Sequence, residues 1–428
     1  MKVNIFLFRR DLRLSDNIAL NNALKSGRRV LPVFIFDDNI LDELPETDAR
    51  VAFIHSTLKE IDVQLKKLGS SLFVFKGKPI DIWHKITQKY DIEAVSWNRD
   101  YEPYAIKRDA EITHFLNQKN IQVKSFRDQV IFEPSEILKS DGNPYTIYTP
   151  FKKQWLLKLE KTEIIPETIP LKNEYFVQQK NNFPTLEEIG FKKSNISVPL
   201  ANYDNIIDYE KYRDLPAIDR TTNLSTHLRF GTVSIREVFQ KALQNDVFIS
   251  ELIWREFFMQ ILYFFPHVVT ESFKKKYDAI KWRNNKKEFE LWCNGETGYP
   301  IVDAGMRQLN QTGLMHNRVR MIVASFLTKH LLIDWRWGEA YFAEKLLDFE
   351  LSSNNGNWQW AAGTGCDAAP YFRVFNPTTQ QEKFDKNFEY IKRWLPEFLE
   401  LSYIPPIVDH KFARKRAIDT YKSGLHNN

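Results

Sequence analysis

Short apolar runs and helical segments alternate along the first third of the chain. The runs have the length of strands, and the segments between them carry apolar residues three or four positions apart, as in Val51, Ile54 and Leu58. Strands are expected at residues 3–8, 30–36, 71–75 and 94–97, and helices at 17–25, 50–68 and 80–89. Fully apolar strands that alternate with amphipathic helices are typical of a parallel sheet covered on both faces. The pattern therefore predicts a doubly wound α/β domain over residues 1–130.

The pattern changes beyond residue 130. Seven prolines interrupt residues 131–200 and no periodicity is visible there, which predicts a connecting segment. From residue 201 onward, apolar positions return to helical spacing. Helices are expected at 234–244, 249–264, 301–309, 316–330, 337–347 and 388–394. The second domain, residues 201–428, is therefore predicted to be all-helical.

Composition and charge are those of a soluble protein. Hydrophobic residues make up 43% of the chain and charged residues 27%. Two cysteines, Cys293 and Cys366, cannot form a disulfide framework or a zinc site, which suits a reducing compartment. Charges at positions 9–11 exclude a signal-peptide core, and no apolar run approaches the roughly 18 residues that span a membrane. We expect a cytoplasmic monomer with no metal, membrane or protein partner.

Basic residues gather in one run. The net charge is +5, and seven Lys and Arg side chains fall between Lys274 and Lys287. Such a run is commonly a solvated face, and it is also the pattern of a surface that contacts a polyanion. Both interpretations stay open on the sequence alone.

Tryptophan is concentrated toward the end of the chain. Eight of the 11 tryptophans lie beyond residue 250, and two of them, Trp358 and Trp360, fall in the segment NNGNWQWAAGTGCDAAPYFRVFNP, residues 354–377. Small residues allow a backbone to approach a flat ligand, and tryptophan can stack on a base or pass an electron. A packed Trp-rich turn is the alternative explanation of this segment.

Three further segments suggest sites. Residues 221–234 contain six hydroxyl side chains at a predicted helix start, where backbone N–H groups favour a phosphate, although N-capping explains some of them. In 251–258, Glu251 and Trp254 share one helix face and could hold a base, or form part of a salt-bridged helix with a core tryptophan. In 312–321, Arg320 is expected to pair with Asp348 across a cofactor site.

Several long motifs occur in one order over nearly the full length. They are FRRDLRLSDN (8–17), YEKYRDLPAIDRTTNLSTHLRFG (209–231), ELIWREFF (251–258), GETGYPIVDAGMRQLNQTGLMHNRVRM (295–321), LLIDWRWGE (331–339) and NNGNWQWAAGTGCDAAPYFRVFNPTTQ (354–380). On these motifs the chain resembles the photolyase/cryptochrome family, and most of all the bacterial class I photolyases that act on cyclobutane pyrimidine dimers. The resemblance implies an N-terminal α/β domain and a C-terminal helical domain that binds FAD.

The resemblance also implies the residues around the cofactor. Asn354 is expected to face flavin N5, and Trp358, Trp335 and Trp282 are expected to relay an electron from the surface to the flavin. The implied FAD contacts are Tyr209, Thr221, Thr222, Asn223, Leu224, Ser225, Arg255, Arg320, Asp348, Glu350 and Asn354. A second, antenna chromophore is implied for some members.

The implied substrate is UV-damaged DNA containing cyclobutane pyrimidine dimers. Trp254 and Trp360 resemble the pair that sandwiches a flipped lesion. The other implied lesion or DNA contacts are Arg213, Glu251, Asn317, Arg318, Met321 and Gln380. The dimer has no acidic proton or acyl group to attack, so one electron from light-excited reduced FAD, rather than acid–base chemistry, is expected to open it.

Two departures from the family pattern matter. Glu350 replaces the second acid of the family's Asp-x-Asp and is one methylene longer. Tyr104 and Ala105 stand where some relatives carry a folate-binding Asn-Glu pair, which favours a deazaflavin or a second flavin over folate as any antenna. A (6-4) photolyase needs histidines where this chain has Asn317 and Met321. A cryptochrome receptor, the alternative from another class, commonly adds a long C-terminal tail and has no need of a lesion-binding Trp-x-Trp.

Overall fold

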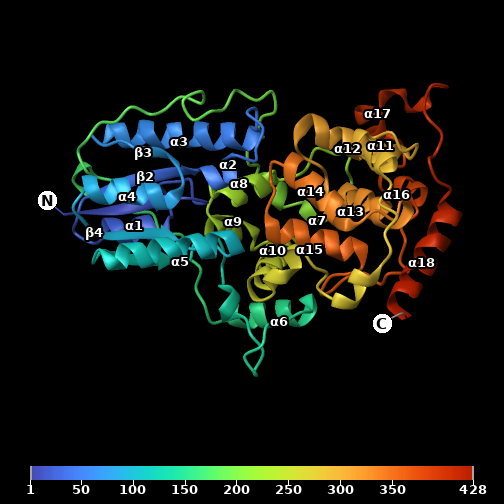
Figure 1. Cartoon of the computed structure of the whole chain (residues 1–428), viewed down its shortest axis with the longest axis horizontal. Helices are drawn as coiled ribbons and strands as arrows, with labels where there is room; N and C mark the ends of the chain where they lie inside the picture. The colour runs from blue at the N-terminus through green and yellow to red at the C-terminus, as the bar shows by residue number, and fades with distance from the viewer. Residues whose placement is uncertain (1, 427–428) are drawn as a thin grey trace. The chain divides into compact units, whose positions relative to one another are not determined.

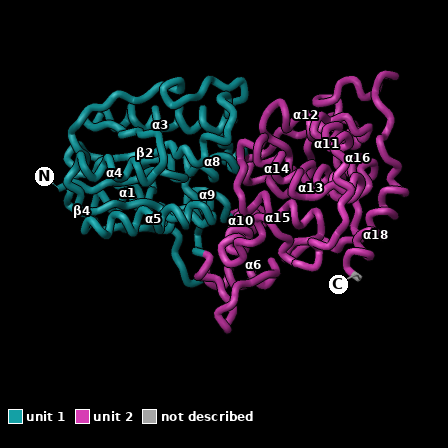
Figure 2. The backbone as a smooth tube through the Cα atoms, viewed as in Figure 1, with its two compact units in different colours: residues 1–133, 159–203, 223–243 teal, residues 134–158, 204–222, 244–428 magenta. Residues whose placement is uncertain are grey.

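The computed structural model describes residues 2–426 of the chain. It divides into two compact units, which are coloured separately in Figure 2. Unit 1 consists of residues 1–133, 159–203 and 223–243, and unit 2 consists of residues 134–158, 204–222 and 244–428. No helix in the described range is long and apolar enough to cross a membrane.

Unit 1 is built on a parallel sheet (Figure 1). Its strands are β1 (Val3–Phe8), β2 (Val30–Asp37), β3 (Phe73–Gly77), β4 (Ile92–Asn98) and β5 (Gln122–Phe126), in the order β3-β2-β1-β4-β5. The first four agree with the predicted strands to within two residues. The fifth strand, QVKSF, was missed because polar residues interrupt it and leave no apolar run.

Helices cover both faces of this sheet, as predicted. They are α1 (Ile18–Leu24), α2 (Asp38–Leu41), α3 (Ala49–Lys67), α4 (Pro79–Lys89) and α5 (Pro103–Gln118). Successive side chains of a strand point to opposite faces. Phe6 and Phe8 of β1 accordingly pack in the cluster under α1 and α3, whereas Ile5 and Leu7 pack in the cluster under α4 and α5. The doubly wound fold is therefore confirmed.

The compact units divide the middle of the chain differently from the predicted domain bounds at residues 130 and 200. Residues 131–200 are not all irregular, because they include α6 (Tyr148–Leu159), and residues 134–158 belong to unit 2. Two buried polar contacts explain that membership: Trp155 Nε1 donates to Glu256 at 2.6 Å, and Gln260 Nε2 donates to the carbonyl of Ile137 at 2.7 Å. The prolines on either side of α6 hid this helix from sequence analysis.

Conversely, α8 (Leu224–Phe230) and α9 (Ile235–Ala242) belong to unit 1, although they fall in the predicted second domain. A buried ionic network holds them there. Arg236 lies 2.9 Å from Asp16 and 2.7 Å from Asp128, and Arg13 lies 2.7 Å from the other oxygen of Asp128. Burial raises the pKa of Asp128, but the two guanidinium groups outweigh burial and lower it below its ordinary value.

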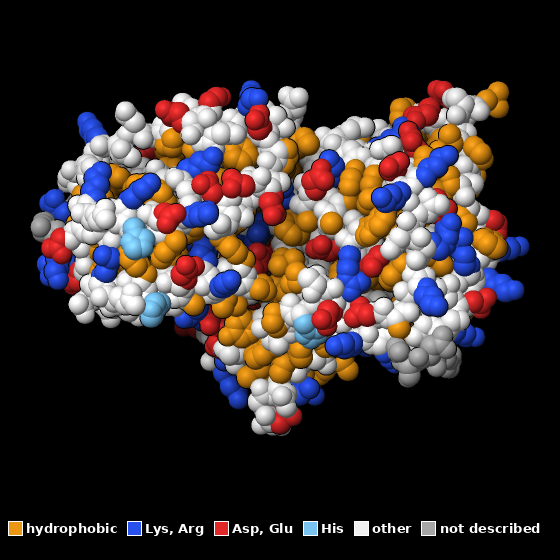
Figure 3. All heavy atoms as spheres, viewed as in Figure 1, with side chains coloured by type: hydrophobic (Ala, Val, Ile, Leu, Met, Phe, Trp, Pro, Cys, Tyr) orange, Lys and Arg blue, Asp and Glu red, His pale blue; other side chains and the backbone are white. Residues whose placement is uncertain are grey.

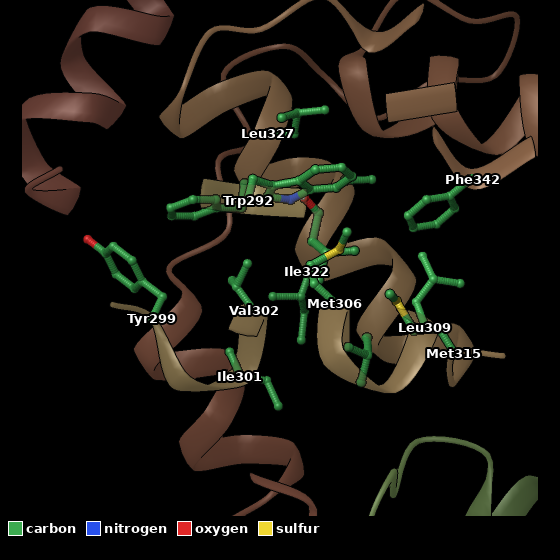
Figure 4. Close-up of a cluster of buried hydrophobic side chains, with 14 of the residues drawn as sticks. Trp292, Tyr299, Ile301, Val302, Met306, Leu309, Met315, Ile322, Leu327 and Phe342 are labelled. Carbon is green, nitrogen blue, oxygen red and sulfur yellow. The ribbon is translucent and has the colours of Figure 1, made fainter. Parts of the chain in front are cut away.

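Unit 2 is helical, as predicted. Its helices are α6 (Tyr148–Leu159), α7 (Tyr209–Tyr212), α10 (Asp246–Phe264), α11 (Lys286–Asn294), α12 (Pro300–Thr312), α13 (Asn317–Ser325), α14 (Trp335–Lys345), α15 (Leu351–Ala362), α16 (Pro377–Phe384), α17 (Glu389–Trp394) and α18 (His410–His426). The predicted helix 316–330 is α13 followed by a π-helical turn at Phe326–His330. Figure 4 shows the centre of the core, where Trp292 lies among apolar side chains that include Ile322, Leu327 and Phe342.

We predict that Asp128→Asn destabilises the protein by about 3–5 kcal/mol, because it leaves two buried guanidinium groups without their shared carboxylate. The native pKa of Asp128 is lowered. Its stabilising contribution is therefore present above the unfolded pKa of about 3.9 and is lost as pH falls through the native pKa. Urea unfolding of the variant measures the effect. Asp219→Asn, at an exposed carboxylate, is the control, and equal midpoints for the two variants would contradict the prediction.

Candidate functional site

A pocket in unit 2 gathers many of the predicted residues. It has a volume of about 610 Å³ including its open mouth, within the range of small-molecule and cofactor sites. Its lining comes from α13, from α14, from the turn before α15 and from α15. The lining residues are Asn317, Arg320, Met321, Ala324, Phe342, Leu346, Asp348, Phe349, Glu350, Ser353, Asn354, Asn357, Trp358, Trp360 and Ala361. Eight of them were predicted to bind cofactor or lesion or to carry an electron.

Two glycines position α15 beside this pocket. A Cβ at Gly356 of α15 would lie 2.1 Å from the ring of Phe258 on α10, and one at Gly338 of α14 would lie 2.1 Å from the ring of Trp358. Only glycine permits contacts this close. Asn355 and Gln359 then fix the helix, because both donate to the carbonyl of Val268, at 2.9 and 3.0 Å. The segment was not predicted to be helical because Asn and Gly are weak helix formers.

One edge of the pocket is polar. Arg320 Nη2 lies 2.9 Å from Asp348, as the sequence suggested. Asn354 Nδ2 donates to Glu339 Oε1 at 2.8 Å and to the Glu339 carbonyl at 3.1 Å. Burial raises the pKa of Glu339. Glu339 was missed, although it ends the LLIDWRWGE motif.

Glu350, the departure from the family pattern, has its own partners. Its Oε1 lies 3.4 Å from Arg255 Nη2, and its Oε2 accepts from Ser353 Oγ at 3.1 Å. Glu350 is 5% exposed, so the extra methylene is accommodated by packing and an ion pair. The structure thereby links two residues that were predicted separately to contact the cofactor.

The lining suits a flavin. The cofactor is not part of the structure, but an isoalloxazine is a flat apolar ring system with carbonyl and N–H groups along one edge. Phe342, Phe349 and Trp358 provide apolar walls, and the Arg320–Asp348 pair and Asn354 provide donors and acceptors on one side. The residues present therefore fit the predicted FAD.

The predicted lesion contacts fall into two groups. Trp360, Asn317 and Met321 line the pocket. Trp254 does not; its ring stacks on Tyr148 with centroids 3.5 Å apart and planes 5° from parallel. Tyr148 was missed because it lies in the segment taken for a connector.

Glu251 and Arg213 form an ion pair at 2.7 Å. Burial raises the pKa of Glu251 above its ordinary value, although Arg213 opposes the shift. Arg213 also lies over the ring of Tyr209, 5.3 Å from its centroid. The structure thus brings together Glu251, which was predicted to contact the lesion, Arg213, which was predicted to contact DNA, and Tyr209, which was predicted to contact FAD.

The remaining predicted DNA contacts are Arg318 and Gln380. Arg318 is held by Asp214 at 2.6 Å and lies over the ring of Phe384, 4.4 Å from its centroid. Gln380 is half-buried on α16, the same helix as Phe384. These two residues therefore belong to one neighbourhood, which the sequence order did not reveal.

The three predicted relay tryptophans share the apolar core of unit 2. Trp358 and Trp335 are 2% and 1% exposed, and Trp282 is half-buried against the same cluster. The Nε1 atom of Trp335 has no hydrogen-bond partner among the described residues. The order of the relay stays a prediction.

The hydroxyl-rich segment 221–234 has mixed roles. Ser234 caps α9 by accepting from the N–H of Arg236, and Thr232 Oγ1 lies 2.7 Å from His227 Nδ1. Thr221 and Ser225 are exposed, and Asn223 has a left-handed φ of 54° at the start of α8. The division between the compact units falls between Thr222 and Asn223. Capping thus explains part of the segment, and its predicted phosphate contacts, Thr221, Thr222, Asn223, Leu224 and Ser225, stay predictions.

Charged side chains meet at the carboxyl ends of the strands in unit 1. Tyr104 donates to Asp37 at 2.6 Å, Arg108 lies 3.8 Å from the same carboxylate, and Arg9 pairs with Asp109. This is the edge at which doubly wound sheets bind ligands. The antenna chromophore stays a prediction.

Comparison with known proteins places the chain in a family. A model described as DNA photolyase matches residues 4–170, and a model described as the FAD binding domain of DNA photolyase matches residues 248–402. The chain belongs to the DNA photolyase family. The second match also confirms FAD as the predicted cofactor.

The similar proteins match over nearly their whole length. The deoxyribodipyrimidine photo-lyases of Halobacterium salinarum and Escherichia coli are 39% and 35% identical, covering 98% and 99% of this chain and 99% of each relative. A class III photolyase structure from Agrobacterium tumefaciens has a TM-score of 0.89 at 34% identity, covering 100% of this chain and 98% of that one. An archaeal photolyase structure from Sulfolobus tokodaii, which holds two FAD molecules, has a TM-score of 0.87 at 38% identity, covering 98% and 99%.

We predict that Gly356→Ala lowers stability by about 1–3 kcal/mol, because its methyl group would overlap the Phe258 ring. The shift of α15 would also reduce the FAD retained on purification, which flavin absorbance per chain measures. Phe258→Leu in the same chain should restore part of both. Additive losses in the double variant would contradict the proposed contact.

Proposed function

We propose that this protein repairs DNA by splitting cyclobutane pyrimidine dimers in a light-dependent reaction. One observation carries the proposal. The pocket places Trp360, Asn317 and Met321, predicted to contact the lesion, beside Arg320, Asp348 and Asn354, predicted to contact the flavin. Lesion and cofactor would therefore share one site. The relatives named deoxyribodipyrimidine photo-lyase support the same reaction class.

The cofactor would supply the electron: bound reduced FAD, once excited by light, is the donor to the dimer. The protein's residues have the tasks of binding, orienting and excluding water. Trp360 offers a face for a flipped base, a contact of about 1–3 kcal/mol. Flipping is cheapest where base pairing is already damaged, which favours a lesion over intact DNA.

Asn354 is proposed to face the N5 position of the reduced cofactor. Its Nδ2 points to two acceptors on Glu339, so its Oδ1 remains the acceptor on the other side. The N5 position of a flavin carries a hydrogen only in the reduced states, and an amide oxygen accepts from it. Glu339 thus acts as a positioning residue that fixes which way the amide faces.

Glu251, when protonated, is proposed to donate a hydrogen bond from its O–H to a carbonyl oxygen of the dimer. The burial that raises its pKa increases the fraction that is protonated near neutral pH. Arg213, 2.7 Å away, holds the side chain in place and supplies positive charge near the electron received by the lesion. Through its contact with Glu251, Arg213 is proposed to act at the lesion in addition to its predicted contact with DNA.

The relay is proposed to run from Trp358 through Trp335 to Trp282. Trp335 is buried and its Nε1 lacks an acceptor among the described residues. If it loses an electron, no hydrogen-bonded acceptor among the described residues takes its proton, and the positive charge is proposed to move on toward the surface. Trp282, half-buried, is the proposed outer end.

A (6-4) photolyase is disfavoured by the state of His316. It caps α13 and its Nδ1 accepts from the N–H of Arg318. Burial lowers the pKa of His316 to about 4, so the ring is neutral at physiological pH. A proton donor for (6-4) chemistry would need the opposite state. The receptor alternative has one supporting observation, a Synechocystis cryptochrome structure with a TM-score of 0.85 at 25% identity, covering 98% of this chain and 99% of that one.

The primary test uses the reduced, FAD-loaded protein and an oligonucleotide with one thymine cyclobutane dimer. We expect restored thymines under near-UV or blue light and none in the dark. An oligonucleotide with one (6-4) lesion, irradiated in parallel, should remain unrepaired. Bound flavin without repair of either lesion would favour the receptor function instead.

For Glu251→Gln we predict a quantum yield lower by about twofold to tenfold, because an amide is a weaker donor than a carboxylic acid. The wild-type yield should fall as pH rises through the raised pKa of Glu251, and the variant should lose this dependence. Glu60→Gln, at an exposed carboxylate in unit 1, is the control. An unchanged yield in Glu251→Gln would refute the donor role.

A further inference from the structure

Positive charge in this protein is concentrated in two segments of unit 2. Residues 274–287 carry seven Lys and Arg side chains against one Asp, and α18 carries five against one. This surplus of ten positive charges is twice the net charge of +5 of the whole chain, so the rest of the chain is net negative. None of the pocket-lining residues lies in either segment.

The two segments pack against each other. Tyr421 of α18 shares a buried cluster with Tyr277 and Ile280. A Cβ at Gly424 would lie 3.2 Å from the Cα of Ile280, so the two backbones approach closely. Together, residues 274–287 and α18 form one face, called here the basic surface.

Several lysines of the basic surface point to solvent, whereas Arg283 pairs with Glu288 at 2.7 Å and Arg416 donates to the carbonyl of His330. Lys281, Lys286 and Lys415 are exposed, and within residues 2–426 none of the three forms an ion pair. Figure 3 shows Lys and Arg side chains gathered where α18 lies. Unpaired charges of one sign produce a potential that attracts and orients a partner of opposite sign.

Trp282 lies inside the basic surface. It stands between Lys281 and Arg283, and its ring meets the ring of Tyr421 edge-on with centroids 5.8 Å apart. α18 therefore helps to position Trp282, and the basic residues of α18 and of residues 274–287 belong to the same packed face. The outer end of the proposed relay is the most positively charged part of the chain.

We propose that the basic surface docks an acidic electron-transfer protein that returns one electron to oxidised Trp282. The proposal rests on the proposed relay. The redox centre of the partner loses one electron and Trp282 gains it, no bond is broken, and any proton lost by the indole returns from water. The sequence alone implied no protein partner, because α18 and residues 274–287 are far apart in the chain.

The dimensions favour a protein over a small reductant or DNA. α18 has 17 residues and is therefore about 25 Å long, which a small molecule cannot span. Phe412, in its first turn, is 59% exposed. An exposed aromatic side chain within a charged rim is the composition of a protein interface. The bases of a nucleic acid can also stack on an exposed aromatic side chain, but a nucleic acid would not supply the electron.

The test follows Trp282 directly in the FAD-loaded, oxidised protein. A laser flash generates the tryptophan radical, and its decay is recorded against the concentration of reduced flavodoxin, an acidic FMN protein used as the probe. We expect the bimolecular rate constant to fall about tenfold between roughly 20 and 300 mM salt. Lys281→Glu, Lys286→Glu and Lys415→Glu in one chain should lower it at least about tenfold at low salt.

The matched control reverses the charges of Lys59, Lys85 and Lys107, which are exposed on α3, α4 and α5. It changes the net charge equally and should leave the rate constant near the wild-type value. Uncharged dithiothreitol should reduce the radical equally in all three proteins. Calorimetric titration with flavodoxin, in the dark, should show weaker binding for the basic-surface variant alone.

Three outcomes would overturn the proposal. One is an equal loss in the control variant, which would mean that net charge alone matters. Another is unchanged flavodoxin binding with weakened binding of undamaged duplex DNA, which would identify the basic surface as a DNA contact. If the flash yields no tryptophan radical, the relay of the proposed function fails, and the dark titration still decides whether the docking surface exists.

Discussion

The close approach of α15 to α10 and α14 is the constraint on which the pocket depends. Gly356 and Gly338 remove the side chains that would separate these helices, and Phe258 and Trp358 fill the space. α15 contributes Ser353, Asn354, Asn357, Trp358 and Trp360 to the pocket, so its position fixes the proposed flavin and lesion contacts at once. Because the contact is between ring faces and a backbone, it tolerates little adjustment.

Paired charges make the neighbourhood of the pocket polar without leaving isolated ions in it. Arg320 pairs with Asp348, and Arg255 pairs with Glu350. Each pair offsets part of the cost of removing a charge from water, and each holds a side chain in one orientation. A reaction that moves only an electron requires this preorganisation, since fixed dipoles and charges need not rearrange when the charge of the lesion changes.

The sequence predicted most regular elements because their signals are local. The first four strands and helices such as α3, α4 and α10 follow apolar periodicity and caps. It missed β5 and several helices, among them α5, α6, α11, α15, α16 and α18, where polar, Pro-flanked or Gly-rich segments obscure the apolar periodicity. Tertiary contacts stabilise these elements instead. In α6, for example, Trp155 donates a hydrogen bond to Glu256 of α10.

For the candidate site, the sequence by itself determined the family and the FAD cofactor, because these reside in short motifs. The Arg320–Asp348 pair was also foreseeable from two such motifs. Only the tertiary structure decided that Tyr148 stacks on Trp254, that Glu339 orients Asn354, and that Tyr421 of α18 packs against Trp282. Each of these contacts joins residues from different elements, and no periodicity or spacing along the chain encodes which surfaces will pack together.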